Sequence, residues 1–146
     1  MTIKQALKKK NKLVQKLTDV SKKITTYNSY DNDSVRPYDV RQLVEEETNL
    51  LNELVDLKTK IHTANLPVYS KIFRLSELKS QVSKLKSLDC TEGKSRDRWG
   101  RITEDNPTLK TVIINVVERD NMVEAMENEI ESIQDHLDMF NATTII

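Results

Sequence analysis

Glycine and proline are scarce in this sequence, which has only two Gly and three Pro among 146 residues. A compact β fold needs many tight turns, and turns draw on these two residue types. Aromatic residues make up 5% of the chain, too few for a thick globular core. Charged residues reach 32% and hydrophobic residues 37%, a balance that favours long amphipathic helices joined by thin apolar seams.

Long apolar runs and paired cysteines are also lacking. No run of 18 apolar residues is present, so we expect no membrane-spanning helix. The lysine-rich start, MTIKQALKKKNK, is followed by no apolar block, so we expect no signal peptide. The lone Cys90 has no partner for an internal disulfide, which favours a reducing, cytoplasmic location.

Motifs for catalysis and metal binding are missing as well. A nucleophilic Cys90 would need a base, and nothing in the sequence selects between His62 and His136. A di-iron bundle needs Glu three residues before His, where this chain has Thr59 and Ile133. Gly93-Lys94-Ser95 resembles the end of a P-loop, but Leu88 occupies the position of the required first glycine. We therefore expect no enzyme, no metal and no cofactor.

Charge is segregated although the net charge is zero. Residues 1–23 hold eight Lys and one Asp (+7), and residues 118–138 hold eight Asp or Glu and one Arg (−7). The basic segment could be a nucleic-acid arm or a solvated helix face near the acidic helix of the same or another chain. The close balance favours the second interpretation, so we do not expect nucleic-acid binding.

Three long helices are predicted from heptad-like seams. Thr2 to Gln5 forms a capping box before the first, and Asp39 to Gln42 forms one before the second. The seams are Leu13, Leu17, Val20, Ile24 and Tyr27; Leu43, Leu50, Leu54, Leu57, Ile61 and Ala64; and Val123, Met126, Ile130, Ile133, Leu137 and Phe140. The first two helices should form an antiparallel hairpin. Val40, Val44, Leu51 and Val55 widen the second seam, which favours contact with more than one partner helix.

A shorter helix is predicted from near Ser76, with Leu75, Leu78, Val82 and Leu85 on its seam. The β-branched run TLKTVIINVV predicts a strand near 109–117, paired with a short strand near 101–103 or with another chain. The last helix should start near Asp120. The fold class is thus mainly α, a long antiparallel helical hairpin or coiled-coil bundle with a small β element near 101–117. We expect residues 1–146 to form one domain and the wide seams to make it a homo-oligomer.

The strongest candidate binding segment lies in the predicted loop that contains both glycines. Four cations and the only tryptophan share it: Lys94, Arg96, Arg98, Trp99 and Arg101. Arginine forks bind phosphate and an indole stacks on a base. The alternative is that Trp99 plugs the end of the bundle while the arginines pair with nearby Asp and Glu side chains.

Two further groups of residues are candidates for ligand binding. Tyr27, Asn28, Tyr30, Arg36 and Tyr38 surround the predicted hairpin loop, and His62, Asn65, Tyr69 and Arg74 surround the far end of the second helix. Both could instead only cap helices and stabilise loops. Arg74 and Asn65 would join the 94–101 segment if the third helix folded back along the second.

Three segments resemble the septicolysin-like family of small helical proteins from bacteria and their phages: TIKQALKKKNKLVQKL, IHTAN at 61–65, and IESIQDHLDMFNATTII. His62 and Phe140-Asn141 depart from the family pattern, and residues 86–101 are the least family-like. The resemblance implies a helical fold with a small β element, oligomerisation and no established activity. A phage association would suit sequestration of a host nucleotide signal.

These observations predict a non-catalytic oligomeric binding protein that holds an anionic small ligand, such as a cyclic or linear nucleotide. The alternative is a structural or adaptor coiled-coil protein that binds other protein chains.

Overall fold

The chain is mainly α, with helices packed antiparallel, as the sequence predicts. The computed structural model describes residues 1–94, 99 and 109–146. Its contacts divide it into two compact units, Met1–Tyr69 with Leu137–Ile146 and Ser70–His136. The assignment of residues 1–146 to a single domain stays a prediction. Within the described residues no helix is long and apolar enough to cross a membrane.

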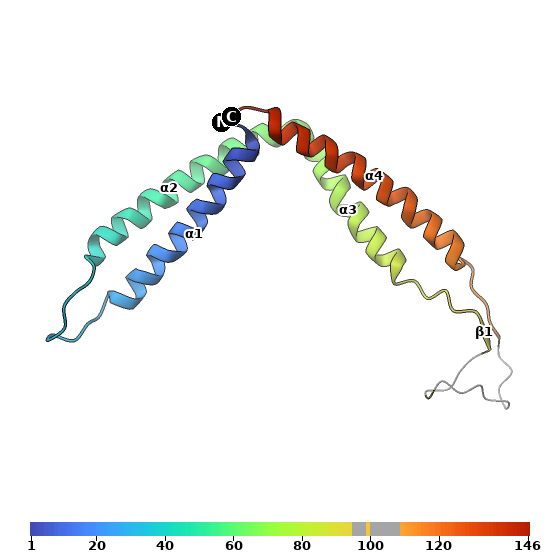
Figure 1. The fold of residues 1–146 in the computed structure, drawn as a ribbon, viewed down its shortest axis with the longest axis horizontal. Helices are drawn as coiled ribbons and strands as arrows, with labels where there is room; N and C mark the ends of the chain where they lie inside the picture. The colour runs from blue at the N-terminus through green and yellow to red at the C-terminus, as the bar shows by residue number, and fades with distance from the viewer. Residues whose placement is uncertain (95–98, 100–108) are drawn as a thin grey trace. The chain divides into compact units, whose positions relative to one another are not determined.

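The first unit is built on a helical hairpin of α1 (Ile3–Tyr27) and α2 (Val40–Asn65), which run side by side in Figure 1. Thr2 and Gln5 form the predicted capping box, with each side chain accepting a backbone N–H of the other residue. Asp39 caps α2 by accepting the N–H groups of Arg41 and Gln42. These caps satisfy N–H groups that a helix start leaves without partners.

The hairpin is held together by the predicted apolar seams. Their buried members form one cluster, comprising Ala6, Leu13, Val20, Leu50, Leu54, Leu57 and Ile61. Leu17, Ile24 and Leu43 pack against this cluster and are partly buried. The seam predictions for the first two helices are confirmed. The core is one layer thick, as the low aromatic content indicates.

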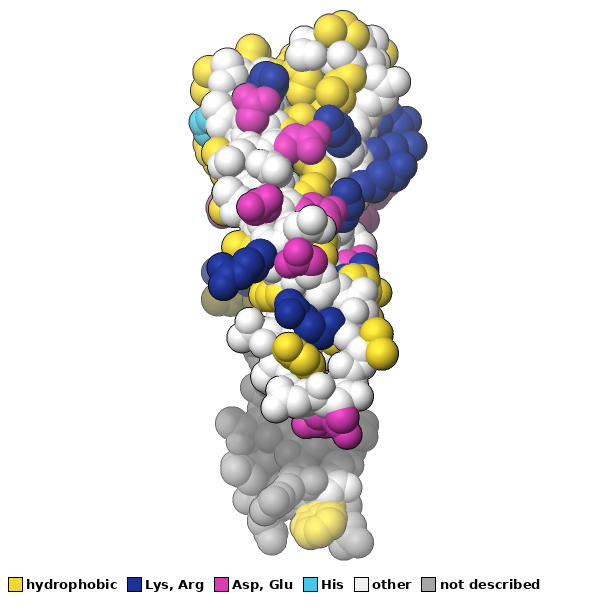
Figure 2. Space-filling model, turned by 90° about the vertical axis from the view of Figure 1, so that its left-hand side faces the viewer, with side chains coloured by type: hydrophobic (Ala, Val, Ile, Leu, Met, Phe, Trp, Pro, Cys, Tyr) yellow, Lys and Arg dark blue, Asp and Glu magenta, His cyan; other side chains and the backbone are white. Residues whose placement is uncertain are grey.

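Ion pairs lie along one side of the hairpin. Lys9 Nζ is 2.7 Å from Glu53 Oε1, and Lys16 Nζ is 3.1 Å from Glu46 Oε1. On the face in Figure 2, basic and acidic side chains lie next to one another with hydrophobic side chains between them. Exposed pairs of this kind add little stability, but they favour one register of α1 against α2. Part of the basic first helix is thus neutralised by α2.

The two chain termini lie side by side in the first unit (Figure 1). Thr2 and Ile145 form an antiparallel bridge. The Ile3 N–H donates to the Thr144 carbonyl at 3.0 Å, and the Ile146 N–H donates to the Met1 carbonyl at 2.9 Å. Ile3 beside this bridge is fully buried. The end of the last helix is therefore tied to the start of α1 by backbone hydrogen bonds.

The second unit contains all but the first residue of α3 (Tyr69–Lys86) and the greater part of α4 (Val116–Thr143), and these two helices run antiparallel. The α3 helix starts seven residues before the predicted Ser76, directly after a 3₁₀ turn at Leu66–Val68. Its seam residues Leu78 and Val82 are buried, as is Val123 of α4. The remaining α4 seam residues are buried or partly buried, so this seam prediction is also confirmed.

The β element is smaller than predicted. β1 (Gly93–Lys94) and β2 (Leu109–Lys110) pair antiparallel, with Gly93 opposite Lys110. The predicted strand at 109–117 is wrong beyond residue 110, because Val116 and Val117 begin α4. Asn115 accepts the Glu118 N–H at 2.9 Å and so starts the helix earlier than Asp120. The partner strand is 93–94, and the expected partner at 101–103 lies outside the described residues.

Removing one seam side chain should weaken the hairpin. Leu54→Ala, at a position 6% exposed, should lower the free energy of unfolding by about 2–5 kcal/mol, because it leaves a cavity in a single-layer core. Leu66→Ala, at a position 59% exposed, is the matched control and should change it by less than about 0.5 kcal/mol. Urea denaturation followed by circular dichroism measures both. Equal effects would contradict the assigned core.

Candidate functional site

A concave surface lies at the loop end of the first hairpin, where α1 gives way to the loop and α2 begins. We call it the tip cavity. It has a volume of about 570 Å³, and the lining residues are Tyr27, Asn28, Tyr30, Arg36, Val40, Arg41, Val44 and Glu45. Four of the five residues that the sequence singles out at this loop line the cavity. The fifth, Tyr38, packs against the lining residue Tyr27.

Aromatic rings and cations are interleaved around the tip cavity. The Tyr27 and Tyr38 rings have centroids 5.0 Å apart and are tilted by 53°. Lys23 Nζ lies 5.0 Å from the centre of the Tyr38 ring, and Arg36 Cζ lies 5.0 Å from that of Tyr30. Contacts of a cation with a ring face are attractive and order the side chains involved. They hold Arg36 and Tyr38 at the tip, where the sequence predicts ligand-binding residues.

Two arginines, Arg36 and Arg41, line the tip cavity. In the described part of the chain, neither Arg36 nor Arg41 forms an ion pair. Glu45 lines the same cavity and gives it one acidic group. Arginine pairs with oxyanions through two parallel hydrogen bonds, so both groups are suited to bind a phosphate or carboxylate.

Most of the predicted 94–101 segment lies outside the described residues, namely Arg96, Arg98 and Arg101. Lys94 belongs to β1, opposite Leu109. Trp99 is 83% exposed, so it does not plug the end of a helical bundle. A role for Lys94, Arg96, Arg98, Trp99 and Arg101 in binding stays a prediction.

The group at the far end of α2 is brought together in part. The Tyr69 hydroxyl hydrogen-bonds to His62 Nδ1, and the two rings are 5.2 Å apart at their centroids. The Asn65 Oδ1 atom is buried and has no hydrogen-bond partner among the described residues. Asn65 and Tyr69 thus lie in the same turn region, where the Asn65 Oδ1 atom accepts no hydrogen bond from the described residues. Neither residue lines a cavity described for the first unit.

Arg74 belongs to the second unit and is bound to α4. Its Nε donates to Glu129 Oε1 at 2.8 Å and its NH2 group donates to Oε2 at 3.0 Å. These hydrogen bonds hold the pKa of the Glu129 carboxyl below its usual value and raise the pKa of Arg74. With both carboxylate oxygens engaged, Arg74 joins α3 to α4. Its expected place beside the 94–101 segment is untested, since most of that segment is not described.

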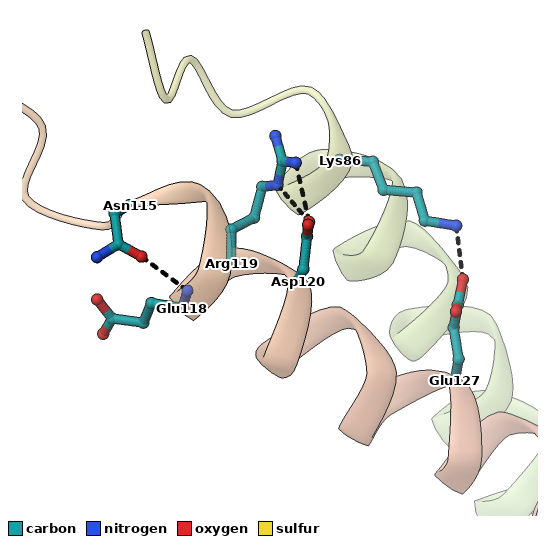
Figure 3. A network of polar contacts seen from close by, with 6 residues as sticks. All are labelled: Lys86, Asn115, Glu118, Arg119, Asp120 and Glu127. Carbon is teal, nitrogen blue, oxygen red and sulfur yellow. Dashed lines mark hydrogen bonds and ion pairs between the residues drawn. The ribbon is translucent and has the colours of Figure 1, made fainter. Parts of the chain in front are cut away.

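A polar network surrounds the start of α4 (Figure 3). Lys86 Nζ on α3 lies 2.5 Å from Glu127 Oε1, and the Arg119 guanidinium contacts Asp120 at 2.8 Å. Nearby along the chain, Lys110 forms an ion pair with Asp89. Hydrogen bonds from Lys110 and then Thr91 hold the pKa of the Asp89 carboxyl well below its usual range. The Lys86–Glu127 pair therefore joins α3 to α4, and the Lys110–Asp89 pair joins the segment after α3 to the segment before α4.

The sequence interpretation missed Arg41, Val40, Val44 and Glu45 as cavity residues. All four lie in the first turns of α2 and line the tip cavity. A signal was present, because positions 41 and 45 are one helical turn apart and carry opposite charges. The described part of the chain brings no three His, Cys, Asp or Glu side chains together as a metal site.

Comparison with known proteins finds no match to a family model, to a curated protein or to a solved structure. The resemblance to the septicolysin-like family therefore stays a hypothesis. The assignment of the candidate site depends on the geometry alone.

Replacing Arg74 should release Glu129. In Arg74→Gln, the pKa of Glu129 should rise toward the usual carboxyl value, because the two hydrogen bonds that lower it are gone. A carboxyl with a lowered pKa in the folded state stabilises the fold above its unfolded-state pKa. That stabilisation is lost as the pH falls through the folded-state pKa. Carbon-detected NMR titration of the two proteins measures this, and an unchanged Glu129 midpoint would contradict the assigned pair.

Proposed function

We propose that this protein is a non-catalytic binding protein whose tip cavity holds an anionic small ligand with an aromatic ring, such as a nucleotide. The carrying observation is that two arginines without an ion pair in the described part of the chain and two tyrosines, Tyr27 and Tyr30, line one cavity. Sequestration of a nucleotide signal is the role that suits a binder of this kind.

The phosphate would be bound by the arginines. Arg36 comes from the loop and Arg41 from the first turn of α2, so they reach the cavity from two directions. The start of α2 adds backbone N–H groups and the positive end of the helix dipole, which favour an anion. Asp39 already accepts two of these N–H groups, so the side chains supply most of the recognition.

The ring of the ligand would lie against tyrosine. Tyr27 and Tyr30 both line the cavity, and the Tyr30 ring already accepts a cation, Arg36, on its face. Stacking on a tyrosine face tolerates any base, whereas the Asn28 amide and the Glu45 carboxylate can hydrogen-bond to base edges. The cavity volume of about 570 Å³ lies within the range of small-molecule sites.

The proposal is non-catalytic because the cavity contains no nucleophile next to a base. Its titratable side chains are Tyr27, Tyr30, Arg36, Arg41 and Glu45. Hydrolytic chemistry requires a general acid and a general base with different pKa values. A single carboxylate beside two arginines does not provide such a pair. Binding is the function that this set of groups supports.

Isothermal titration with ATP and cyclic AMP tests the proposal. The unmodified chain should give heat with at least one of them. Arg36→Ala combined with Arg41→Ala should weaken binding by at least about tenfold, since a hydrogen bond to a charged group contributes about 1.5–3 kcal/mol. Arg36→Lys combined with Arg41→Lys keeps the charge but loses the paired donors, and it should weaken binding by an intermediate amount.

Two matched variants complete the experiment. Lys10→Ala with Lys12→Ala removes the same charge from α1 away from the cavity and should leave binding unchanged. Arg98→Ala with Trp99→Ala tests the 94–101 segment. No heat with any nucleotide would contradict the proposal and favour a structural or adaptor protein. Loss of binding only in the Arg98 and Trp99 variant would move the site to that segment.

A further inference from the structure

The first turns of α1 carry many cations and no acidic side chain. Residues 1–16 hold six lysines and neither Asp nor Glu. Two of the six, Lys9 and Lys16, are neutralised by Glu53 and Glu46 of α2. In the described part of the chain the other four form no ion pair, namely Lys4, Lys8, Lys10 and Lys12.

Three of these lysines lie along one exposed side of α1. Lys4, Lys8 and Lys12 recur every four residues, so they follow one another along the helix at intervals of about 6 Å. All three are exposed. Asp19 is the first acidic position along this side, and it accepts a hydrogen bond from Gln15 at 3.0 Å. We call the side before Asp19 the basic stripe, and its members are Lys4, Lys8, Asn11, Lys12 and Gln15.

A cleft lies where the start of the basic stripe meets the last turns of α4. Its volume is about 390 Å³, and the lining residues are Lys4, Leu7, Lys8, Asn11, Asp138 and Asn141. All six belong to the first unit, in which the bridge between Thr2 and Ile145 joins the two chain ends. The cleft thus combines two ammonium groups and two side-chain amides with one carboxylate. Lysine and asparagine side chains are among the groups that bind nucleic-acid phosphates.

The described ion pairs of the acidic helix α4 do not involve the basic stripe. The sequence favoured a basic segment neutralised by this helix, and for that reason we did not expect nucleic-acid binding. In the structure Glu127 pairs with Lys86 and Glu129 pairs with Arg74, both on α3. No ion pair among the described residues joins α1 to α4. The charge of the basic stripe is therefore available to an external polyanion.

We propose that the basic stripe binds the phosphate backbone of a nucleic-acid duplex without reading its sequence. A duplex carries one negative charge per about 1.7 Å of its axis, so several phosphates lie within the length of about 12 Å that the three lysines span. Lys4 and Lys8 would hold one phosphate at the cleft, with the Asn11 and Asn141 amides as further donors. The stripe has no aromatic side chain on which the bases of a single strand could stack, which favours a duplex.

The structure favours a nucleic acid over other anionic partners. An interfacial helix binds a lipid surface by inserting its apolar face, but on α1 that face is buried in the hairpin core, with Ala6, Leu13 and Val20. A protein partner is bound mainly through aromatic and arginine anchors, and the basic stripe has neither. This binding goes beyond the proposed nucleotide site, because none of the stripe residues lines the tip cavity.

Fluorescence anisotropy of a labelled DNA duplex of 20 base pairs tests the inference. The unmodified full chain should bind two duplexes of unrelated sequence equally well. Three phosphate contacts should weaken binding about 40-fold between 50 and 200 mM NaCl, since each contributes about −0.9 to the slope of log K against log salt. Lys4→Ala with Lys8→Ala and Lys12→Ala should weaken binding at least about tenfold at 50 mM NaCl. Alanine favours helix at these exposed positions, and circular dichroism checks that the fold is retained.

Three further variants complete the experiment. Lys58→Ala with Lys79→Ala and Lys84→Ala removes the same charge from exposed positions on α2 and α3, and it should bind within about twofold of the unmodified chain. Replacing the three stripe lysines by Arg should retain binding. Arg36→Ala with Arg41→Ala should also retain it, so a failure of the tip cavity to bind nucleotide is read separately.

Three results would overturn the inference. The first is no binding of either duplex at 50 mM NaCl. The second is equal loss of binding in the stripe variant and in the α2 and α3 variant, which would show an effect of net charge alone. The third is binding to vesicles of phosphatidylserine and phosphatidylcholine through the stripe lysines without binding to DNA, which would assign the stripe to a membrane surface.

Discussion

Exclusion of water along one seam of aliphatic side chains is the interaction on which the first hairpin depends. Leu13 and Val20 of α1 and Leu54 and Leu57 of α2 belong to one cluster of buried side chains. A two-helix seam buries few side chains, and isolated helices are marginal in water without tertiary packing. The cap at Thr2 and the backbone bridge between the termini stabilise one end of the hairpin, and the cap at Asp39 stabilises the start of α2 at the other end.

A thin hairpin leaves its functional groups on the surface by necessity. With no interior large enough for an enclosed site, concave surface arises where the chain leaves one helix and enters the next. The tip cavity is such a place, because the loop folds Arg36 and Tyr30 over the ends of both helices. The proposed ligand site at the tip is therefore a consequence of the thin architecture of the hairpin.

The sequence was sufficient to predict the seams, and insufficient to predict where the later helices begin. Heptad spacing reports which side chains are buried together, so Leu50, Leu54 and Ile61 were identified without a structure. The β-branched run before Val116 has strand propensity, but β1 offers it only two paired residues, and the Asn115 cap favours the helix. The strand propensity of this run is therefore outweighed by the helix cap at Asn115 and by the small number of residues available for strand pairing.

The candidate site was predicted only in part for a related reason. Tyr27, Tyr30 and Arg36 lie close in sequence around one loop, so composition could identify them. Arg41 and Glu45 contribute through the direction that α2 takes from Asp39, and this direction is a tertiary property. Arg74 is bound through two hydrogen bonds to Glu129 on α4, 55 positions away, and nothing in the sequence indicated this pairing.

The most direct test of this account is native-state hydrogen exchange followed by NMR. If the seam holds the first hairpin, the amides of Leu13, Val20, Leu54 and Leu57 should exchange slowest in that unit, and the amides of residues 28–38 should exchange fastest. Amides at those four seam positions that exchange as fast as the loop would contradict the account, because the tip cavity requires an intact seam.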